Sequence, residues 1–458
     1  KKLQILLAVG ILLLSLTHSF SQNSVEIPIN AANDALSDFP DGSLADAGIS
    51  EETMKTLEED MKSYVRSGEM PGAEVLIISK GKRLYHKAVG WSDIEGQVPL
   101  QTNTIYSIKS MSKPITNTAV LMLSDQGKLS LDDKVLKYFP DFAGDERTTL
   151  RHLMSHRSGY NGLGNTANHE NILDWTNALV REEMGAEFET YNYADFNFAV
   201  LGAIVEMVSG IPPEKYIEQH ILEPLGMDDT YTNFDKNADW ASRTSNRYRW
   251  WTDRLLLYWT PKVEQEWGFY PGAWGIWGTA GDYAKFLTMW MNGGEYKGKR
   301  YLKESTVKEA VSTHATQNNS SIYGLGWFVL DNSTQPFFGH GGIDGTRAMA
   351  YQNDDMIVIT MTQARASGHL KALWYRLGMY GVVDMHPPFM TENTSTRTTI
   401  SLSSPQEYTG EFMGNIEGQS GMAHMKIMLE GDQLMITIGR LGLATSDLFY
   451  LIPQGDDT

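Results

Sequence analysis

Hydrophobic positions follow two periods in the first part of the chain. Five apolar residues after Ser50 recur at the spacing of one helix face: Met54, Leu57, Met61, Tyr64 and Val65. Since serine is a favoured N-cap residue, this pattern predicts a helix that begins after Ser50. The aliphatic runs 73–78 and 83–89 flank Lys80-Gly81, and this arrangement predicts two strands joined by a tight turn.

Further helices and strands alternate toward the middle of the chain. A second helix is expected from Ser110, because Ser110 precedes a series of apolar residues: Ile115, Ala119, Val120, Met122 and Leu123. An apolar helix should follow Asp195 and end near Ser209-Gly210, and a charged helix should cover 302–311. Strand-like runs at 323–330 and 349–352 enclose a glycine-rich segment, 338–346. The pattern predicts a mixed α+β domain.

Both ends of the chain differ from this central part. Lys1-Lys2, the apolar run 3–16 and Ser19-Phe20-Ser21 have the order of a signal peptide over 1–21, cleaved after Ser21. The apolar run of about 14 residues is shorter than the ~20 that a spanning helix needs, which disfavours the alternative of a membrane anchor. We therefore expect a periplasmic or secreted bacterial protein without stable membrane insertion after cleavage, in which 22–46 form a tether.

Residues 47–388 are expected to form the main domain. His386-Pro-Pro388 and the Thr/Ser-rich stretch that follows mark its end, with a linker over 389–404. Beyond it, 426–430 and 433–438 flank Gly431-Asp432 and predict a hairpin within a small β-rich C-terminal module, 405–458. The sequence leaves open whether this module is complete.

Composition excludes several kinds of chemistry. The 458 residues contain no cysteine, so disulfides, thiolate zinc sites and cysteine nucleophiles are excluded. The formal net charge of −18 argues against a nucleic-acid partner, because phosphate binding needs a basic patch. An acidic surface that keeps an exported protein soluble explains this charge more simply.

Ser110-Met-Ser-Lys113 is the strongest candidate for catalytic chemistry. On a helix, residues three apart share a face with Cβ atoms about 5–6 Å apart, so Lys113 could take a proton from Ser110. The same spacing occurs at 79–82, on a predicted turn, and at 305–308, in a charged helix without an apolar wall. Lys113 must be neutral to act as a base, and we expect burial and the helix dipole to lower its pKa.

Two later segments complete a known order of motifs. Tyr193-Ala-Asp195 and the 338–346 run follow Ser110-x-x-Lys113. The chain thus resembles the serine β-lactamase and penicillin-binding-protein superfamily, in its class C-like esterase and D-aminopeptidase branch, which orders SxxK, Tyr-x-Asn and then Lys-Thr-Gly or His-x-Gly. Further segments are similar to family signatures: 125–133, 137–140, 150–160, 223–230, 278–286 and 323–327. The resemblance implies a β-lactamase/transpeptidase-like fold, with an antiparallel sheet flanked by helices and a mostly helical subdomain.

The resemblance also implies a role for each motif residue. Ser110 would be the acylated nucleophile, Lys113 its base and Tyr193 a second proton carrier. The backbone N–H groups of Ser110 and Ile343 would form the oxyanion hole. Four residues would bind substrate: Asp195, His340, Gly341 and Gly342. No metal or cofactor is expected, because the pair His152 and His156 lacks a third ligand.

Departures from the family pattern bear on the substrate. Asp195 stands in the Asn position, and His340-Gly341-Gly342 replace Lys-Thr-Gly, so the motif lacks a fixed cation and a threonine hydroxyl for a substrate carboxylate. We therefore expect an exported serine hydrolase that cleaves small esters or amides, including D-amino-acid amides or peptides. The alternatives are a β-lactamase or D-Ala-D-Ala carboxypeptidase and, in another class, a non-catalytic sensor of peptidoglycan fragments.

Tryptophans crowd one stretch of the sequence: Trp240, Trp250, Trp251, Trp259, Trp267 and Trp274. Core packing is the simpler interpretation of such a cluster. A wall of the substrate cleft is the functional one.

Overall fold

The structure is a computed structural model. With side chains, it describes residues 26–31, 38–160, 169–182, 185–250, 254–263, 268–317, 320–331, 336–365 and 377. For 251, 410–415, 422–430, 433–440 and 443–450 it describes the backbone. The predicted signal peptide and linker lie outside the described residues.

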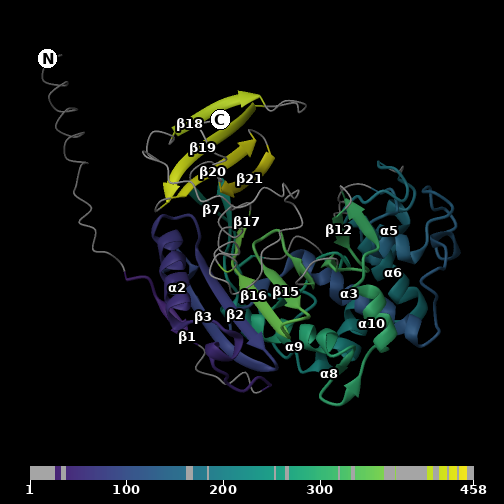
Figure 1. The fold of residues 1–458 in the computed structure, drawn as a ribbon. Helices are drawn as coiled ribbons and strands as arrows, with labels where there is room; N and C mark the ends of the chain where they lie inside the picture. The colour runs from purple at the N-terminus through teal and green to yellow at the C-terminus, as the bar shows by residue number, and fades with distance from the viewer. Residues whose placement is uncertain are drawn as a thin grey trace, which may run out of the picture.

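An antiparallel sheet, whose strand order differs from the order along the chain, forms the centre of the main domain (Figure 1). Its strand order is β1-β3-β2-β16-β15-β14-β13-β12-β11, and β4 pairs with β3. The strands are β1 (Ile29–Ala31), β2 (Gly72–Ser79), β3 (Lys82–Asp93), β4 (Val98–Pro99), β11 (Ala315–Gln317), β12 (Ser320–Tyr323), β13 (Phe328–Leu330), β14 (Phe337–Gly341), β15 (Arg347–Tyr351) and β16 (Met356–Met361). Because β2 pairs with β16, early and late parts of the domain share one sheet.

Helices cover both faces of this sheet. The helix predicted after Ser50 is confirmed as α2 (Glu51–Arg66): Ser50 Oγ accepts a hydrogen bond from Thr53 N at 3.0 Å, and the five apolar residues are buried. α2 packs against β2 and β3, whereas α9 (Ala280–Met291) packs against β2, β15 and β16. Two separate apolar clusters therefore enclose the sheet.

A mostly helical region adjoins the sheet (Figure 1). Its helices are α3 (Ser112–Asp125), α4 (Leu150–Met154), α5 (Ile172–Leu179), α6 (Phe196–Ser209), α7 (Pro213–Ile217) and α8 (Glu223–Leu225). A further short helix is α10 (Glu304–Ala310). α3 packs directly against α6, and both are buried over most of their length. This pair forms the base on which the candidate site lies.

Shorter elements connect these layers. Single-turn helices are η1 (Leu44–Ala47), η2 (Lys109–Met111), η3 (Val135–Lys137), η4 (Glu218–Leu222) and η5 (Asp239–Arg243). The small strands are β5 (Tyr106–Ser107) with β8 (Trp277–Gly278), β9 (Glu295–Tyr296) with β10 (Lys299–Arg300), and β6 (Arg247–Trp251) between β7 (Arg254–Trp259) and β17 (Ala364–Arg365).

The described C-terminal backbone forms a four-stranded antiparallel sheet. Its strands are β18 (Gly410–Asn415), β19 (Met422–Glu430), β20 (Gln433–Arg440) and β21 (Leu443–Tyr450). The predicted hairpin is confirmed, since β19 and β20 pair with Glu430 opposite Gln433. The domain boundaries themselves remain predictions.

Two expectations need correction. Part of the predicted tether belongs to the domain, because Ile29 in β1 pairs with Val89 in β3 and because Phe39 and Leu44 are buried. The predicted strand over 323–330 is two strands, β12 and β13, separated at Gly326, whose φ of 81° forces a turn.

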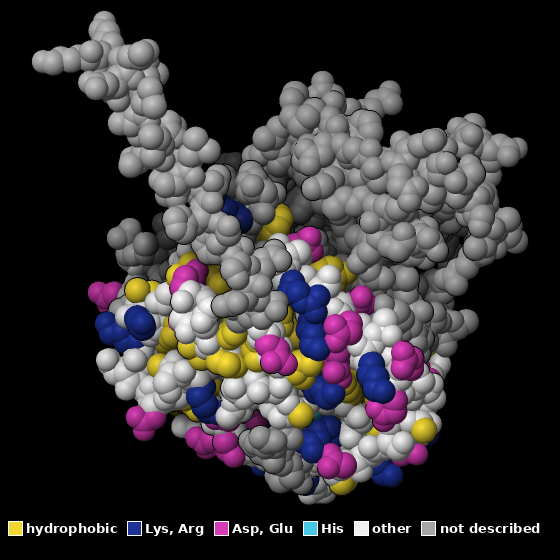
Figure 2. Space-filling view, turned by 90° about the vertical axis from the view of Figure 1, so that its left-hand side faces the viewer, with side chains coloured by type: hydrophobic (Ala, Val, Ile, Leu, Met, Phe, Trp, Pro, Cys, Tyr) yellow, Lys and Arg dark blue, Asp and Glu magenta, His cyan; other side chains and the backbone are white. Residues whose placement is uncertain are grey.

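Charges on the side of the molecule that α2 covers are mixed in sign (Figure 2). Acidic and basic side chains alternate there, and ion pairs such as Lys62–Glu59 and Lys87–Glu58 join them. Among the described residues no single helix is long and apolar enough to cross a bilayer, although Phe196–Ser209 and Pro213–Leu225 would suffice as a bent pair.

Candidate active site

Ser110 lies in the single turn η2, between β5 and the start of α3. The N-cap position of α3 is Met111, so the helix expected from Ser110 begins two residues later, at Ser112. Buried Ile108 and Met111 anchor the turn from either side, and Ile108 N donates to Ile276 O at 3.1 Å. Lys109 adopts a φ of 47°, a strained conformation for a residue with a side chain.

Lys113 is buried beside the Ser110 hydroxyl. Its Nζ donates to Ser110 Oγ at 3.0 Å and to Ala273 O at 3.2 Å. The same ammonium forms an ion pair with the carboxylate of Asp195 and lies 4.7 Å from the centre of the Tyr193 ring. The structure thus brings together Ser110, Lys113, Tyr193 and Asp195 from two separate segments.

The protonation state of Lys113 differs from the expectation. Burial alone would lower the pKa of Lys113, but the Asp195 carboxylate and the Tyr193 hydroxyl outweigh it and raise this pKa. Burial likewise raises the pKa of Tyr193, and the nearby Lys113 charge offsets part of that effect. At neutral pH the resting site therefore holds a charged lysine and a neutral tyrosine, so the predicted neutral Lys113 is corrected.

Asp195 and Tyr193 are placed by the start of α6. Asp195 is its N-cap residue and makes no capping hydrogen bond through its side chain, which turns to Lys113 instead. The expected role of Asp195 was substrate binding, and in the structure its carboxylate is engaged with the proton-carrying group of the site. Its direct effect is on the charge of Lys113.

His340 lies on β14 behind the site and is fully buried. Its Nδ1 donates to Gly341 O at 2.9 Å, so its Nε2 accepts from the Tyr323 hydroxyl, also at 2.9 Å. Burial and the charge of Lys113 lower the pKa of His340 to about 3, so the ring is neutral. With both nitrogens occupied and no exposed surface, His340 supports the site from within, and the expected contact with substrate is corrected.

The turn after β14 carries the other predicted site residues. Gly342 N donates to Thr346 O at 2.7 Å, and Ile343 follows with 56% of its surface exposed. A Cβ on Gly342 would lie 2.4 Å from Ile108 O, so only glycine allows this turn to approach the Ser110 segment so closely. This approach brings the segments of both predicted oxyanion donors, Ser110 N and Ile343 N, against each other.

His156 is a site residue without an assigned role in the sequence-based prediction. It is fully buried, adopts a φ of 55°, and its ring packs at a tilt against Tyr193 with ring centres 4.3 Å apart. Its Nδ1 accepts hydrogen bonds from Ala194 N at 3.1 Å and from the Asn197 amide at 3.0 Å. The segment 150–160 was noticed as a family signature, but sequence spacing gave no indication that it touches Tyr193.

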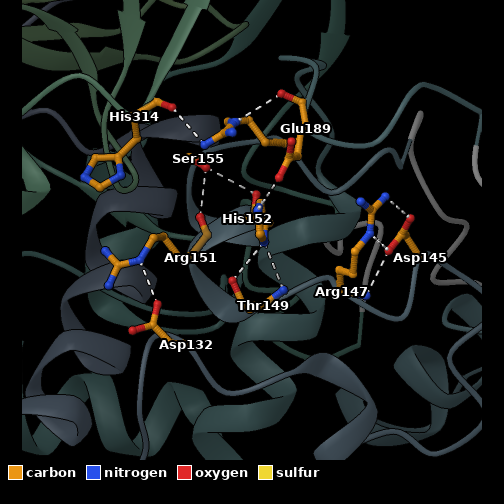
Figure 3. A network of polar contacts seen from close by, with 10 residues as sticks. Asp132, Asp145, Arg147, Thr149, Arg151, His152, Ser155, Glu189 and His314 are labelled. Atoms are coloured by element: carbon orange, nitrogen blue, oxygen red, sulfur yellow. Dashed lines mark hydrogen bonds and ion pairs between the residues drawn. The ribbon is translucent and has the colours of Figure 1, made fainter.

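His152 lies in a different environment, although it is only four residues earlier. Figure 3 shows its ring directed to Thr149, whose backbone N donates to His152 Nδ1 at 3.1 Å, while Glu189 lies on the other side. The two histidines therefore do not face a common centre. Among the described residues, no group of three His, Asp or Glu side chains is arranged to hold a metal ion.

Arg347 is a second residue that the sequence-based prediction missed. It begins β15 and is paired with Gly341, so the two positions share one face of the sheet. Arg347 Nε lies 3.8 Å from where a Gly341 Cβ would be. The guanidinium of Arg347 thus lies beside the position that the family fills with threonine. It comes from strand β15, which the motif does not include.

In the tryptophan-rich stretch, the structure shows core packing at Trp259. Trp259 packs in a small apolar cluster with Trp277 and Phe234, which is the simpler interpretation. This cluster also encloses the guanidinium of Arg247, 5.5 Å from the Trp259 ring. Trp267 lies outside the described residues.

Fold and site together define the class of this protein. The antiparallel sheet, the helical region and a Ser-x-x-Lys pair between them are the features of the β-lactamase/transpeptidase-like fold, a superfamily of serine hydrolases. The family model described as Beta-lactamase matches residues 55–378, and the chain belongs to this family.

Known relatives share this architecture. The chain is 30% identical over 307 residues to the putative penicillin-binding protein PbpX of Bacillus subtilis, covering 65% of this chain and 71% of the relative. The solved structure of EstCE1, a hydrolase with promiscuous acyltransferase activity, covers 74% of this chain and 100% of its own at 21% identity, with a TM-score of 0.63. D-amino acid amidase from Ochrobactrum anthropi covers 72% of this chain and 99% of its own at 17% identity, with a TM-score of 0.58. At these identities the two solved structures show the fold alone.

Proposed function

We propose that this chain is an exported serine hydrolase that cleaves ester or amide bonds of small substrates through an acyl-enzyme on Ser110. The observation that carries the proposal is the 3.0 Å contact between the buried Lys113 Nζ and Ser110 Oγ. A serine hydroxyl is a weak nucleophile and needs a base within this distance. Membership of the Beta-lactamase family supports the same reaction class.

Acylation requires Lys113 to lose its proton to solvent first, directly or through Tyr193, because both groups are protonated at rest. Lys113 then accepts the Ser110 proton while Oγ attacks the substrate carbonyl carbon. The negative charge that forms on the carbonyl oxygen is stabilised by the N–H groups of Ser110 and Ile343. When the tetrahedral intermediate collapses, the proton passes to the leaving group, directly from Lys113 or through the Tyr193 hydroxyl.

Deacylation reverses this sequence with water. A water molecule replaces the departed alcohol or amine, loses a proton to the Lys113–Tyr193 pair and attacks the acyl carbon. Collapse of the second intermediate releases the acid and returns the proton to Ser110. Every step uses residues of this chain, and none requires a metal or cofactor.

Arg347 favours a second candidate substrate class. Its position opposite Gly341 offers a cation for the carboxylate of a penicillin, a cephalosporin or a C-terminal D-alanine. This observation supports the β-lactamase or D-Ala-D-Ala carboxypeptidase alternative, which shares the acyl-enzyme and differs in the substrate. Neutral esters and amides remain the first choice because Gly341 supplies no hydroxyl that would orient a substrate carboxylate beside Arg347.

A substrate screen tests the proposal. Purified protein should hydrolyse short-chain aryl esters or D-aminoacyl amides, and Ser110→Ala should abolish turnover. Lys113→Met should lose activity nearly as completely, because members of one catalytic unit fail together. Ser305→Ala is the matched control, since Ser305 shares the SxxK spacing but lies on α10. A folded wild-type protein that turns over none of these substrates would instead favour the non-catalytic sensor of peptidoglycan fragments.

Export is a separate part of the proposal. The charged, apolar and small-residue order of 1–21 supports a cleaved signal peptide. The mature protein should then begin at Gln22, which N-terminal sequencing of protein from the native host would establish. Cytoplasmic protein that still carries residues 1–21 would contradict export without affecting the proposed reaction.

A further inference from the structure

Asp344 follows Ile343 directly and is a buried carboxylate without a role in the mechanism above. Its side chain is fully buried. Arg247 Nε donates to Asp344 Oδ2 at 2.8 Å, and the Tyr258 hydroxyl donates to Oδ1 at 2.8 Å. Burial would raise the pKa of Asp344, but the charges of Arg247 and Lys109 outweigh it and lower this pKa, so the carboxylate is ionised.

The same carboxylate reaches the nucleophile segment. Lys109 Nζ lies 3.8 Å from Asp344 Oδ2, and Lys109 is the residue immediately before Ser110. Asp344 is therefore joined in sequence to one predicted oxyanion donor, Ile343, and by an ion pair to the neighbour of the other, Ser110. Arg247 and Tyr258, from the β6–β7 hairpin, hold this carboxylate from outside both segments.

These contacts stabilise an unfavourable backbone conformation at Lys109. The φ of 47° at Lys109 lies in the left-handed region, which is unfavourable for a residue with a side chain. The ion pair to Asp344 restrains the Lys109 side chain, and Thr346 Oγ1 adds a hydrogen bond to Ile108 O at 3.3 Å. The two backbone donors thus belong to segments that are locked together before substrate arrives, as oxyanion stabilisation requires.

We propose that Asp344 is a positioning residue that sets the spacing of the oxyanion hole by tying the Lys109-Ser110 turn to the Ile343 turn, with Arg247 and Tyr258 as its supports. The inference rests on the proposed function and adds to it a residue that touches neither nucleophile nor substrate. It explains why a carboxylate flanked by two cations is buried at this point, where an apolar residue would be cheaper to bury.

The test compares Asp344→Asn with the wild type on one aryl ester and one aryl boronic acid. A boronic acid forms a tetrahedral adduct on serine that places an oxygen in the oxyanion hole, whereas the product carboxylic acid reports ground-state binding. Asp344→Asn should lower kcat about 10- to 100-fold and weaken boronic acid binding by a similar factor. KM and product affinity should change by less than about threefold.

Asp282→Asn is the matched control. Asp282 is also a buried carboxylate that is hydrogen-bonded to a lysine, Lys285 at 2.9 Å, but it contacts neither oxyanion segment. It should lose stability and keep kcat per folded molecule. Should Asp344→Asn fail to fold, Tyr258→Phe removes one hydrogen bond to the same carboxylate and should lower kcat severalfold in the same direction.

Two results would overturn the inference. One is an unchanged kcat and boronic acid affinity in folded Asp344→Asn or, failing that, Tyr258→Phe. The other is a loss that appears in KM and product affinity alone, which would mean that Asp344 acts on ground-state binding and not on the oxyanion hole. A wild type with neither ester turnover nor a boronic acid adduct would instead refute the proposed function, and this inference with it.

Discussion

At the scale of single residues, the site depends on the charge of one lysine. Asp195, in the position that the family fills with asparagine, holds Lys113 in its protonated form through the direct ion pair. A base that is protonated at rest is active only at a pH above its pKa. Because Lys113 and Tyr193 are coupled, the apparent pKa belongs to the pair. The acidic limb of the pH profile should therefore report on Asp195.

Asp195→Asn should move this acidic limb to lower pH. Without the carboxylate, burial acts on Lys113 with less opposition and lowers its pKa, so the basic form is present at a lower pH. The measurement is kcat/KM for an aryl ester against pH. Asp132→Asn is the control, because Asp132 forms an exposed pair with Arg151 away from the site (Figure 3). A limb that stays in place or moves to higher pH would show that Asp195 does not set this equilibrium.

At the scale of elements, the proposed oxyanion hole depends on the close approach of two turns. Gly342→Ala should push the Ile343 turn away from Ile108, since the added Cβ would lie 2.4 Å from Ile108 O. We expect a destabilisation of about 1–3 kcal/mol and a kcat that falls more than KM rises. Thermal unfolding and ester kinetics would measure both.

Gly268→Ala is the control for this substitution. Gly268 has no described atom within 4 Å of an added Cβ, so the change should affect neither stability nor kcat appreciably. If Gly342→Ala behaved like Gly268→Ala, the close packing of the two turns would have no catalytic consequence.

The elements that the sequence predicted correctly are those marked by a cap or a turn within a few residues. The Ser50 cap, the Lys80-Gly81 turn and the 431–432 turn each act within a few residues, and α2, β2–β3 and β19–β20 form there. Strand β14 was missed because glycines dominate the 338–346 run, and its pairing with β13 and β15 arises from the buried Phe337 and Phe338. The family resemblance supplied the overall fold, which local patterns do not specify.

Contacts between distant segments account for what was not predicted at the site. Arg247 and Asp344 are 97 residues apart, and His156 reaches Asn197 across 41. The expectation of a neutral Lys113 rests on burial and the helix dipole, and the sequence gives no measure of how closely Asp195 approaches it. Motif order located Ser110, Lys113 and Tyr193, but the electrostatic balance among them requires coordinates.

At the scale of the whole molecule, strand pairing in the sheet bears on the proposed substrate preference. Because β15 follows β14 in the sheet, Arg347 stands beside Gly341 and restores a cation that the His340-Gly341-Gly342 motif lacks. The wild type is expected to prefer short-chain aryl esters to a chromogenic cephalosporin in kcat/KM. Arg347 should nevertheless supply most of whatever activity the cephalosporin shows.

Arg347→Gln should therefore lower kcat/KM for the cephalosporin about tenfold and leave the neutral ester within about twofold. The comparison of both substrates at one pH, for wild type and variant, measures this difference. Equal losses on both substrates would mean that Arg347 supports the fold instead of reading a carboxylate. A wild type that favours the cephalosporin would move β-lactamase to first place.

The central claim is that Ser110 is the acylated residue, and peptide mass mapping tests it most directly. Intact protein is treated with a fluorophosphonate or a penicillin probe, digested, and searched for the modified peptide, with Ser110→Ala treated in parallel. The account predicts one adduct, on Ser110, that disappears in Ser110→Ala. An adduct on Ser79 or Ser305, or no adduct on a folded protein, would contradict it.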